Sequence, residues 1–490
     1  MKTENAHRNT VNHWTDRRHF LSNSACGLGS IALASLLTSQ NAGASAVQDS
    51  HQNEGTVPAF PQFMPRAKRV IQIFSPGGVS QVDTFNYRPE LERLDGQPLT
   101  GKGEIDTFFA SPGVLRKSFF RFRQYGQSGA WVSDLFPHLS GQMDHLAVLQ
   151  AMVAKSPSHQ PACFQMNTGY TLAGFPSLGA WLSYGLGTSN ENLPVFVVLP
   201  DPRGLVNGGT ANWTNGFLPA EHQGTQFRMD TNDPVANLST PASVSKSQRR
   251  RGMKLVEHLN RDFADTSTVD TQLRARLKAY ELAARMQTSI PETVDFRDET
   301  EVTQNLYGIH DPVIGPTARN FLLSRRLIER GVRFVQIYNG GALGSPRINW
   351  DAHENVVENH TAQARLLDQP CAALLADLRQ RGLMEDTLVV WATEFGRTPF
   401  TQGPSGLGRD HHQHAFTCWM SGAGIREGIQ YGSTDEVGYK PAEHPTTIYD
   451  FHATILHLLG IDHEQLTFRH NGLDRRLTDV HGRVIEGILA

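Results

Sequence analysis

The fold is clearest in the stretch RVIQIFSPGGVSQVDT, residues 69–84. Its first six residues form a short, β-branched and apolar run, and Ser75-Pro76-Gly77-Gly78 follows directly. Such a run predicts a buried strand that ends in a loop, and the glycines would let the backbone approach a ligand closely. Similar short apolar runs occur at residues 146–152, 195–199, 333–338, 387–393 and 415–420.

Helical patterns lie between several of these runs. The clearest is residues 361–381, where Leu367, Cys371, Leu374 and Leu378 recur at helical spacing. Strands that alternate with helices predict an α/β fold, with a doubly wound, mostly parallel sheet covered by helices on both faces. Two further helices are expected at residues 317–331 and 446–459.

Residues 245–300 differ from their surroundings because they are strongly charged and begin with the run Arg249-Arg250-Arg251. We interpret them as a charged helical insertion on the outside of the fold. The basic run is more typical of a solvated face than of a ligand site.

The N-terminus carries the order Arg17-Arg18-His19-Phe20-Leu21, which resembles the twin-arginine export signature. A mildly apolar stretch and the small-x-small pattern Ala44-Ser45-Ala46 follow. We therefore expect residues 1–46 to be a signal peptide, residues 47–64 a linker and residues 65–490 the folded domain. This predicts passage through the twin-arginine export machinery to the periplasm or the extracellular space. The alternative is a disordered tail with a chance arginine pair.

Composition excludes several classes of protein. The formal net charge is −3, from 45 basic and 48 acidic residues, so no electrostatic footprint for nucleic acid is present. No other apolar run approaches 18 residues, which predicts no membrane span in the mature chain. The three cysteines beyond the signal, Cys163, Cys371 and Cys418, are an odd number and predict packed thiols.

Ligands of parallel α/β sheets collect at the carboxyl ends of strands, so the residues after each apolar run are candidates. Asp83 follows the first run and could bind a metal, although it serves equally well as a helix cap. Ser158 and His159 follow the second run at the expected start of a helix, where a nucleophile would meet an anionic substrate. The alternative there is an N-cap serine beside a surface histidine.

Two later runs end in carboxylates. Asp351 and His353 follow residues 333–338, and a carboxylate with an imidazole suits zinc or a similar divalent metal. Glu394 ends residues 387–393, with Arg397 close behind, so a metal and an anion could be held side by side. A structural ion pair between Glu394 and Arg397 is the alternative.

The densest candidate segment is Gly408-Arg409-Asp410-His411-His412-Gln413-His414. Three imidazoles and a carboxylate within five residues favour metal binding or catalysis over packing. Alternate members, His412 for example, would then face solvent or support the ligands from behind.

These segments together resemble the bacterial family catalogued as domain of unknown function 1501, over nearly all of residues 67–488. The resemblance implies a branch of the alkaline phosphatase and sulfatase superfamily, with one or two divalent ions of zinc, calcium, manganese or magnesium. The matching segments are SPGGVSQVDTF, HQPACFQMNTG, WDAHEN, ATEFGRTP, GRDHHQHAF and the tail GLDRRLTDVHGRVIEGIL.

The resemblance also implies individual ligands. Asp83 would fill the first-strand aspartate, Asp351 and His353 the central ligand positions, Glu394 a further aspartate position, and His411 or His414 the late histidine. Phe395 departs from the pattern, because the superfamily commonly has a ligand histidine there.

The nucleophile implied by the resemblance is open. His159 occupies the nucleophile position of sulfatases and Cys163 their arginine position, which argues against a formylglycine sulfatase. Either His159 or Ser158 attacks, or no covalent step occurs, or the site is catalytically silent.

Two functions from different classes follow. The first is an exported metal-dependent hydrolase of phosphate or sulfate esters, in which Arg397 or Arg409 stabilises charge on the reacting group. Its substrate would be a small anionic ester or a sulfated or phosphorylated glycan. The second is a non-catalytic binding protein of the cell envelope that retains the fold.

Overall fold

The computed structural model describes residues 60–490, apart from residue 110, residues 345–346 and 404–405, and parts of the segment 230–270. The expected signal peptide and residues 47–59 of the expected linker lie outside the described residues. The predicted insertion over residues 245–300 is described in part and contains helix α8 (Thr271–Val294). The chain divides into two compact units, and the fold below belongs to the unit formed by residues 54–235 and 281–490.

The described residues form a central sheet of nine strands in the order β13-β5-β12-β9-β1-β8-β6-β7, with β16 beside β5. Every pairing is parallel except those of β12, which runs antiparallel to both β5 and β9. The strands are β1 (Arg69–Phe74), β5 (Ala147–Val153), β6 (Phe196–Leu199), β7 (Thr225–Gln226), β8 (Phe334–Tyr338), β9 (Thr387–Ala392), β12 (Phe416–Gly422), β13 (Ile429–Tyr431) and β16 (Thr446–Thr447). The mostly parallel sheet is as predicted.

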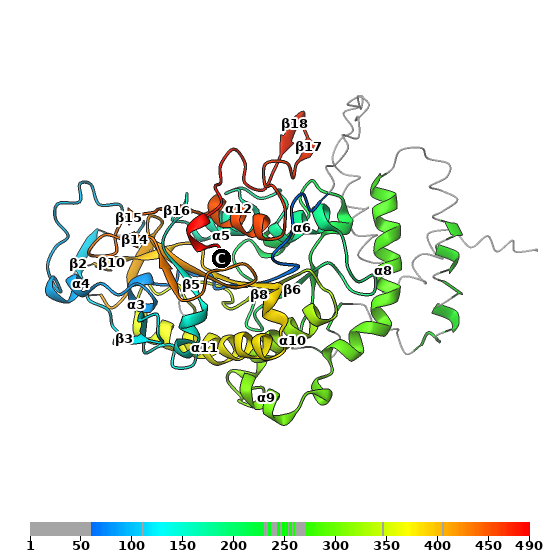
Figure 1. Ribbon diagram of the computed structural model, residues 1–490, viewed down its shortest axis with the longest axis horizontal. Helices are drawn as coiled ribbons and strands as arrows, with labels where there is room; N and C mark the ends of the chain where they lie inside the picture. Colours follow the sequence, from blue (N-terminus) through cyan, green and yellow to red (C-terminus); the bar gives the residue numbers. More distant parts are fainter. Residues whose placement is uncertain are drawn as a thin grey trace, which may run out of the picture. The chain divides into compact units, whose positions relative to one another are not determined.

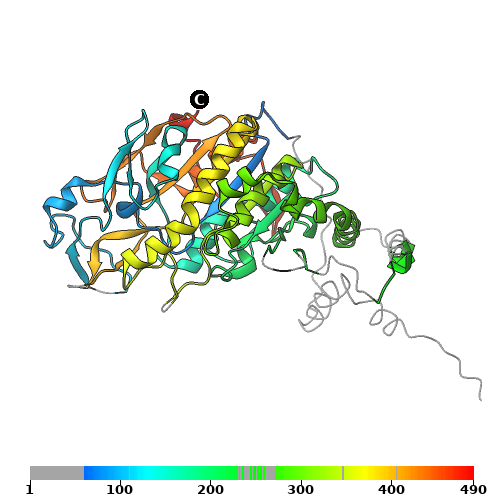
Figure 2. The ribbon, with the colours of Figure 1, turned by 90° about the horizontal axis from the view of Figure 1, so that it is seen from below.

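Helices cover both faces of this sheet (Figure 1). One face carries α5 (His159–Thr168), α6 (Leu178–Leu186) and α12 (Ile448–Leu458). The other carries α10 (Gly315–Glu329) and the long α11 (Val356–Gln380), which runs along the sheet in Figure 2. Val70, Ile71, Ile73 and Phe74 of β1 are all buried, which explains the continuous apolar run of that strand. The doubly wound α/β fold is confirmed.

Three smaller helices complete this unit, namely α3 (Gln81–Thr84), α4 (Pro89–Arg93) and α9 (Glu301–Tyr307). A three-stranded sheet contains β11 (Arg409–His412), β10 (Gly396–Gln402) and β2 (Pro112–Leu115), and β10 and β11 follow β9 in the chain. It pairs Arg397 with His411 and so brings the histidine-rich segment to the carboxyl end of the central sheet. The remaining strand pairs are β3 (Phe122–Tyr125) with β4 (Ala130–Ser133), β14 (Ser433–Thr434) with β15 (Pro441–Glu443), and β17 (Phe468–His470) with β18 (Leu473–Arg475).

Two findings concern the apolar runs and the cysteines. Within the described part of the chain, no helix combines the length and apolar character needed to cross a bilayer. Cys163, Cys371 and Cys418 are buried free thiols, as expected from their odd number.

We expect the buried histidine His452 to make the protein less stable in acid. Burial of His452 in α12 lowers its pKa from 6.5 to about 4, and its Nε2 lies 2.9 Å from the carbonyl oxygen of Met166. Below pH 6.5 the unfolded chain binds a proton at His452 that the folded chain refuses, so the free energy of unfolding falls as pH falls toward 4. Between pH 7 and pH 5 we expect this residue to remove about 2 kcal/mol.

Urea unfolding at pH 7 and pH 5 measures this loss, and the variant His452→Gln is the comparison. The variant should lose about 2 kcal/mol less than the wild type over the same interval. An identical pH dependence in both proteins would show that His452 does not titrate as described.

Candidate metal centre

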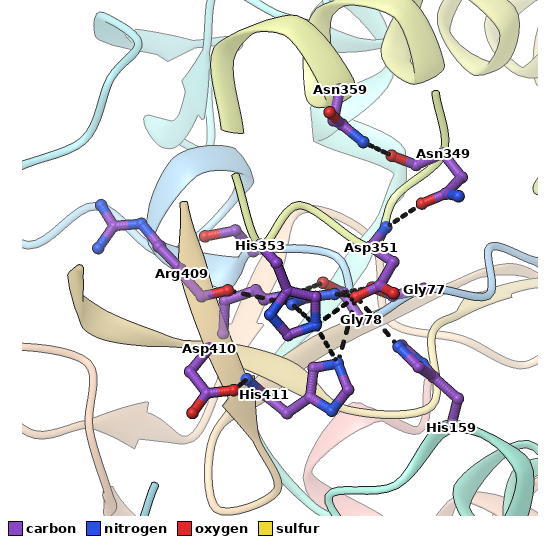
Figure 3. A network of polar contacts seen from close by, with 12 residues as sticks. Gly77, Gly78, His159, Asn349, Asp351, His353, Asn359, Arg409, Asp410 and His411 are labelled. Atoms are coloured by element: carbon purple, nitrogen blue, oxygen red, sulfur yellow. Dashed lines mark hydrogen bonds and ion pairs between the residues drawn. The ribbon is translucent and has the colours of Figure 1, made fainter. Parts of the chain in front are cut away.

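Four side chains converge at the carboxyl ends of the central strands (Figure 3). His159 begins α5 just after β5, Asp351 and His353 lie on the loop after β8, and His411 lies on β11. One ligand atom from each of the four residues lies within 4.8 Å of the others, so the group could hold a metal ion. We call these four residues the His/Asp cluster.

The cluster is centred on one carboxylate oxygen, Oδ1 of Asp351. The Nε2 atoms of three imidazoles surround it, at 3.1 Å for His159, 2.8 Å for His353 and 3.2 Å for His411. Three nitrogens and one carboxylate oxygen form the donor set that zinc and related divalent ions prefer.

The opposite nitrogen of each imidazole is held by an oxygen. Nδ1 lies 2.6 Å from Oε1 of Glu394 in His159, 2.6 Å from Oε1 of Gln402 in His353, and 2.7 Å from the carbonyl oxygen of Pro157 in His411. Because these oxygens only accept hydrogen bonds, each Nδ1 carries a hydrogen, and a ring with that one hydrogen presents its Nε2 lone pair to the cluster. Metal-binding histidines are normally fixed in this way.

One close contact between two imidazoles shows whether the cluster suits a positively charged ion. Nε2 of His353 lies 2.8 Å from Nε2 of His411. With both hydrogens on Nδ1, two lone pairs face one another at that distance, and this arrangement is favourable only with a positive charge near them. The residues present therefore fit a divalent cation.

Electrostatics within the cluster favour the ionised carboxylate. Burial alone raises the pKa of Asp351, but Arg397 and the three imidazoles outweigh it and hold that pKa well below its usual range. Burial alone lowers the pKa of His159, but hydrogen bonds to Asp351 and Glu394 raise it overall. Burial is the main reason that the pKa of His411 is lowered, which favours its neutral form.

Arg397 is fully buried, and its guanidinium faces the protein. Nε donates to the carbonyl oxygen of Gly78 at 2.8 Å, one terminal nitrogen donates to that of Arg409 at 3.1 Å, and the other donates to Gly77. The last nitrogen also lies 2.6 Å from Oδ1 of Asp351. Arg397 therefore orients Asp351 and the loop that carries Gly77 and Gly78, which we call the glycine loop. The donor nitrogens of Arg397 do not point into the pocket described below.

The glycine loop requires its glycines. Gly77 has φ +125°, and an added Cβ would come within 2.7 Å of the Trp350 Cβ. Gly78 has φ +69°, and an added Cβ would come within 2.5 Å of the Phe395 ring. Positive φ and close packing both exclude larger residues here. The loop thus packs tightly against Trp350 and Phe395. The Phe395 ring, at the position where the resemblance implies a ligand histidine, also lies 4.9 Å from the ring of His159 and 4.6 Å from that of His411.

Glu394 is fully buried and lies behind His159, outside the His/Asp cluster. Its carboxylate accepts hydrogen bonds from the backbone N–H of Gly77 at 2.8 and 3.0 Å, in addition to the contact with His159. Glu394, which the sequence predicts as a metal ligand, therefore connects the glycine loop to His159 through hydrogen bonds.

The other predicted site residues lie apart from the cluster. Asp83 is fully buried and pairs with Arg409 at 2.7 Å, and this partner helps hold its pKa below the usual value in spite of burial, which raises it. His414 lies 2.9 Å from a carboxylate oxygen of Asp106. Ser158 is the N-cap residue of α5, and its side chain makes no capping hydrogen bond.

A pocket of about 560 Å³ opens beside the cluster. All four cluster residues line it, and Phe109 at its edge is 63% exposed, with its ring 5.1 Å from that of His353. The other lining residues are Gly344, Arg347, Ile348, Glu354, Asn355, Glu358, Asn359 and Gln402. The pocket gives a ligand access to the point where the imidazoles meet.

The loop that carries Phe109 is anchored by residues that sequence reasoning did not single out. Oδ2 of Asp410 accepts hydrogen bonds from the backbone N–H groups of Phe108 and Phe109 at 2.8 and 3.0 Å. The Phe108 ring stacks on His411 with a centroid distance of 5.0 Å. Asp410 stands in the dense histidine segment, which was the available signal, whereas nothing in the sequence marked Phe109, Gln402 or the Pro157 carbonyl.

The chain belongs to the family described as "Protein of unknown function (DUF1501)", whose model matches residues 67–489. This confirms the family predicted from the motifs. No curated protein matches the sequence.

Solved structures that match include members of the alkaline phosphatase superfamily. One is a protein of that superfamily from Vibrio parahaemolyticus, at 11% identity, covering 83% of this chain and 70% of that one, with a TM-score of 0.36. The PsFucS1 sulfatase from Pseudoalteromonas sp. matches at 11% identity over 84% and 74%, with a TM-score of 0.32. The alkaline phosphatase of the Antarctic bacterium TAB5 matches at 12% identity over 75% and 94%, with a TM-score of 0.32. At such TM-scores the likeness carries no information about activity.

Proposed function

We propose that this member of the DUF1501 family is an exported, metal-dependent hydrolase of phosphate or sulfate esters. The observation that carries the proposal is the convergence of three Nε2 atoms and one carboxylate oxygen at the wall of a pocket. Three imidazoles favour zinc over calcium and magnesium, which prefer oxygen ligands. The exported location is supported by the order Arg17-Arg18-His19-Phe20-Leu21 and the small-residue pattern at residues 44–46.

Each residue of the centre has a separate role in this proposal. His159, Asp351, His353 and His411 bind the cation, which when bound polarises an ester oxygen and lowers the pKa of a water molecule. Glu394, Gln402 and the Pro157 carbonyl fix the three imidazoles in the tautomer that presents Nε2. Arg397 holds the Asp351 carboxylate toward them.

We infer that hydrolysis proceeds without a covalent enzyme intermediate. Ser158, a candidate nucleophile from the sequence, is the N-cap residue of α5 and does not line the pocket. In this proposal Nε2 of His159 binds the cation and Glu394 holds Nδ1, so neither ring nitrogen is left to attack the ester. Water then attacks phosphorus or sulfur directly, the ester oxygen leaves, and Glu354 and Glu358 are the lining carboxylates outside the cluster that could accept the water proton.

The pocket also limits the substrate. Arg347 is the lining arginine and can pair with a substrate oxyanion, since Arg397 and Arg409 make their contacts with the protein. Phe109 and Ile348 offer an apolar wall to the organic part of the ester. A small anionic ester with a flat or apolar leaving group fits this combination.

One observation favours the alternative of a non-catalytic binding protein. The two arginines expected to stabilise charge on the reacting group are fully buried, and their guanidinium groups bind backbone carbonyls and carboxylates. A site with less stabilisation of the transition state would bind an anionic ligand without turning it over.

Turnover separates these two functions. The mature protein, loaded with zinc or manganese, is assayed on p-nitrophenyl phosphate, bis-p-nitrophenyl phosphate and p-nitrophenyl sulfate. We expect hydrolysis of at least one ester, its loss on chelation and its return on adding zinc, and a loss of more than about 100-fold in His411→Ala. Full metal content without turnover on any of the three esters would favour the binding protein instead.

A further inference from the structure

A second and larger pocket, of about 740 Å³, lies near the C-terminal segment of the chain. Its walls come from the loop after β5, the end of β13, the residues before and within the first turn of α12, and residues 480–485. We call it the tail pocket. The residues used below are Lys155, Tyr431, His444, Tyr449, Asp450, His481 and Arg483.

The tail pocket carries an excess of positive charge, from Lys155 and Arg483 against Asp450. Lys155 and Arg483 are exposed, and neither side chain pairs with a carboxylate among the described residues. Asp450 is the one acidic residue that lines the pocket, and both of its oxygens are used. Oδ2 accepts hydrogen bonds from the N–H and hydroxyl of Thr447 at 2.8 and 2.7 Å, and Oδ1 accepts one from the N–H of Arg483 at 2.7 Å. This carboxylate keeps its charge and helps cap α12, so the two cations and one carboxylate leave the pocket with a net positive charge to attract an anion.

Two flat ring pairs line the same pocket. Tyr431 stacks on His444 with centroids 5.2 Å apart, and Tyr449 lies 4.8 Å from His481. The Lys155 ammonium is 4.7 Å from the Tyr449 ring centroid and 3.2 Å from Nε2 of His481. Rings beside cations that pair with no carboxylate suit a ligand that combines a ring with an anionic group, such as a sulfated or phosphorylated sugar.

The tail pocket and the metal centre share one short segment. Lys155 precedes His159 by four residues, and the carbonyl oxygen of Pro157 between them holds Nδ1 of His411. Four extended residues span at most about 14 Å, which limits the separation of the two Cα atoms. The Cα atoms of Lys155 and His159 are thus no further apart than the length of a short oligosaccharide.

We propose that the tail pocket binds a sulfated or phosphorylated sugar unit of an anionic polysaccharide whose reacting ester lies in the metal-centre pocket. The placement of the reacting ester rests on the proposed function, whereas the binding of the anionic sugar does not. A nucleic acid would also offer rings and anions, so its binding is compared directly in the experiment below.

Native gel electrophoresis through dextran sulfate tests the proposal, with unsulfated dextran as the neutral reference. The wild type should be retarded by dextran sulfate alone, and Lys155→Ala/Arg483→Ala should bind it at least about tenfold more weakly. Arg121→Ala/Arg123→Ala also removes two positive charges, at exposed positions outside the tail pocket, and should bind dextran sulfate like the wild type. Equal binding by the two double variants would overturn the proposal, as would tighter binding of a single-stranded oligonucleotide than of dextran sulfate.

Hydrolysis of p-nitrophenyl esters separates the two proposals. Lys155→Ala/Arg483→Ala should hydrolyse these small esters like the wild type, since they do not reach the tail pocket. If the wild type hydrolyses these esters but does not bind dextran sulfate, the proposal for the tail pocket is wrong and the proposed function stands. A wild type that binds dextran sulfate through Lys155 and Arg483 without hydrolysis supports the tail pocket and contradicts the proposed function.

Discussion

Asp351→Asn should abolish metal binding and, with it, hydrolysis. Oδ1 of Asp351 is the point on which His159, His353 and His411 converge, and Arg397 lies 2.6 Å from the same atom. The amide keeps the shape of the carboxylate but removes the negative charge that a divalent cation needs beside three neutral imidazoles. We expect metal affinity and turnover to fall by more than about 100-fold, beyond the effect of losing a supporting residue.

Elemental analysis of the variant and the wild type measures the metal directly. Asp386→Asn is the matched control, because Asp386 pairs with Lys68 and Arg69 near the amino end of β9, at the opposite edge of the sheet. That variant should retain the metal of the wild type. Retention of a full equivalent by Asp351→Asn would show that this carboxylate is not a ligand.

The same variant should also be less stable in the absence of metal. Arg397 is fully buried, and Asp351 is the carboxylate that pairs with it. Removing one partner of a buried pair typically costs about 3–5 kcal/mol, because the remaining charge is left without compensation. Urea unfolding of both metal-free proteins therefore distinguishes a lost ligand from a general failure to fold.

The central sheet could be predicted from the sequence because its strands are buried on both faces. Residues 69–74, 195–199 and 333–338 are short apolar runs, and each matches a strand to within one residue. The reversed direction of β12 could not be read from the sequence, since a fully buried strand has the same composition in either direction. Strands β7 and β16 have two residues each, too few to show a pattern.

The site could be predicted at the level of segments. All four cluster residues follow or precede apolar runs at the carboxyl edge, as the rule for parallel sheets requires. The choice within a segment depends on strand register. Neighbouring residues of β11 point to opposite faces, so His411 reaches Asp351 whereas Nε2 of His412 approaches the carbonyl oxygen of Tyr439. His414 lies beyond the strand and contacts Asp106.

The carboxylates were harder to assign than the histidines. Asp83 and Glu394 are both fully buried, and each has a partner that is distant in sequence, Arg409 for Asp83 and His159 for Glu394. A ligand and a support of a ligand have the same residue type and the same place after a strand. Only the path of the loops decides which of them reaches the cation.

Glu394→Gln should weaken metal binding by about 10- to 100-fold without removing any ligand. Three hydrogen-bond donors point at the Glu394 carboxylate, from Nδ1 of His159, the N–H of Gly77 and the hydroxyl of Thr393. A glutamine offers one oxygen and one NH₂ group in the same space, so a donor must face a donor. Either His159 loses the acceptor that fixes its tautomer, or the N–H of Gly77 loses its hydrogen bond to residue 394.

Gln402→Glu is the informative comparison, because it replaces an amide by a carboxylate, whereas Glu394→Gln replaces a carboxylate by an amide. Gln402 accepts from Nδ1 of His353, and a glutamate keeps that acceptor, so this variant should retain the metal to within about threefold. Competition with a chromogenic chelator measures both affinities, and circular dichroism checks that both variants are folded. If the two variants lose affinity equally, any change behind an imidazole would be enough, and the acceptor would not be the cause. If only Glu394→Gln loses affinity, the acceptor behind His159 is what directs its Nε2 lone pair to the cation.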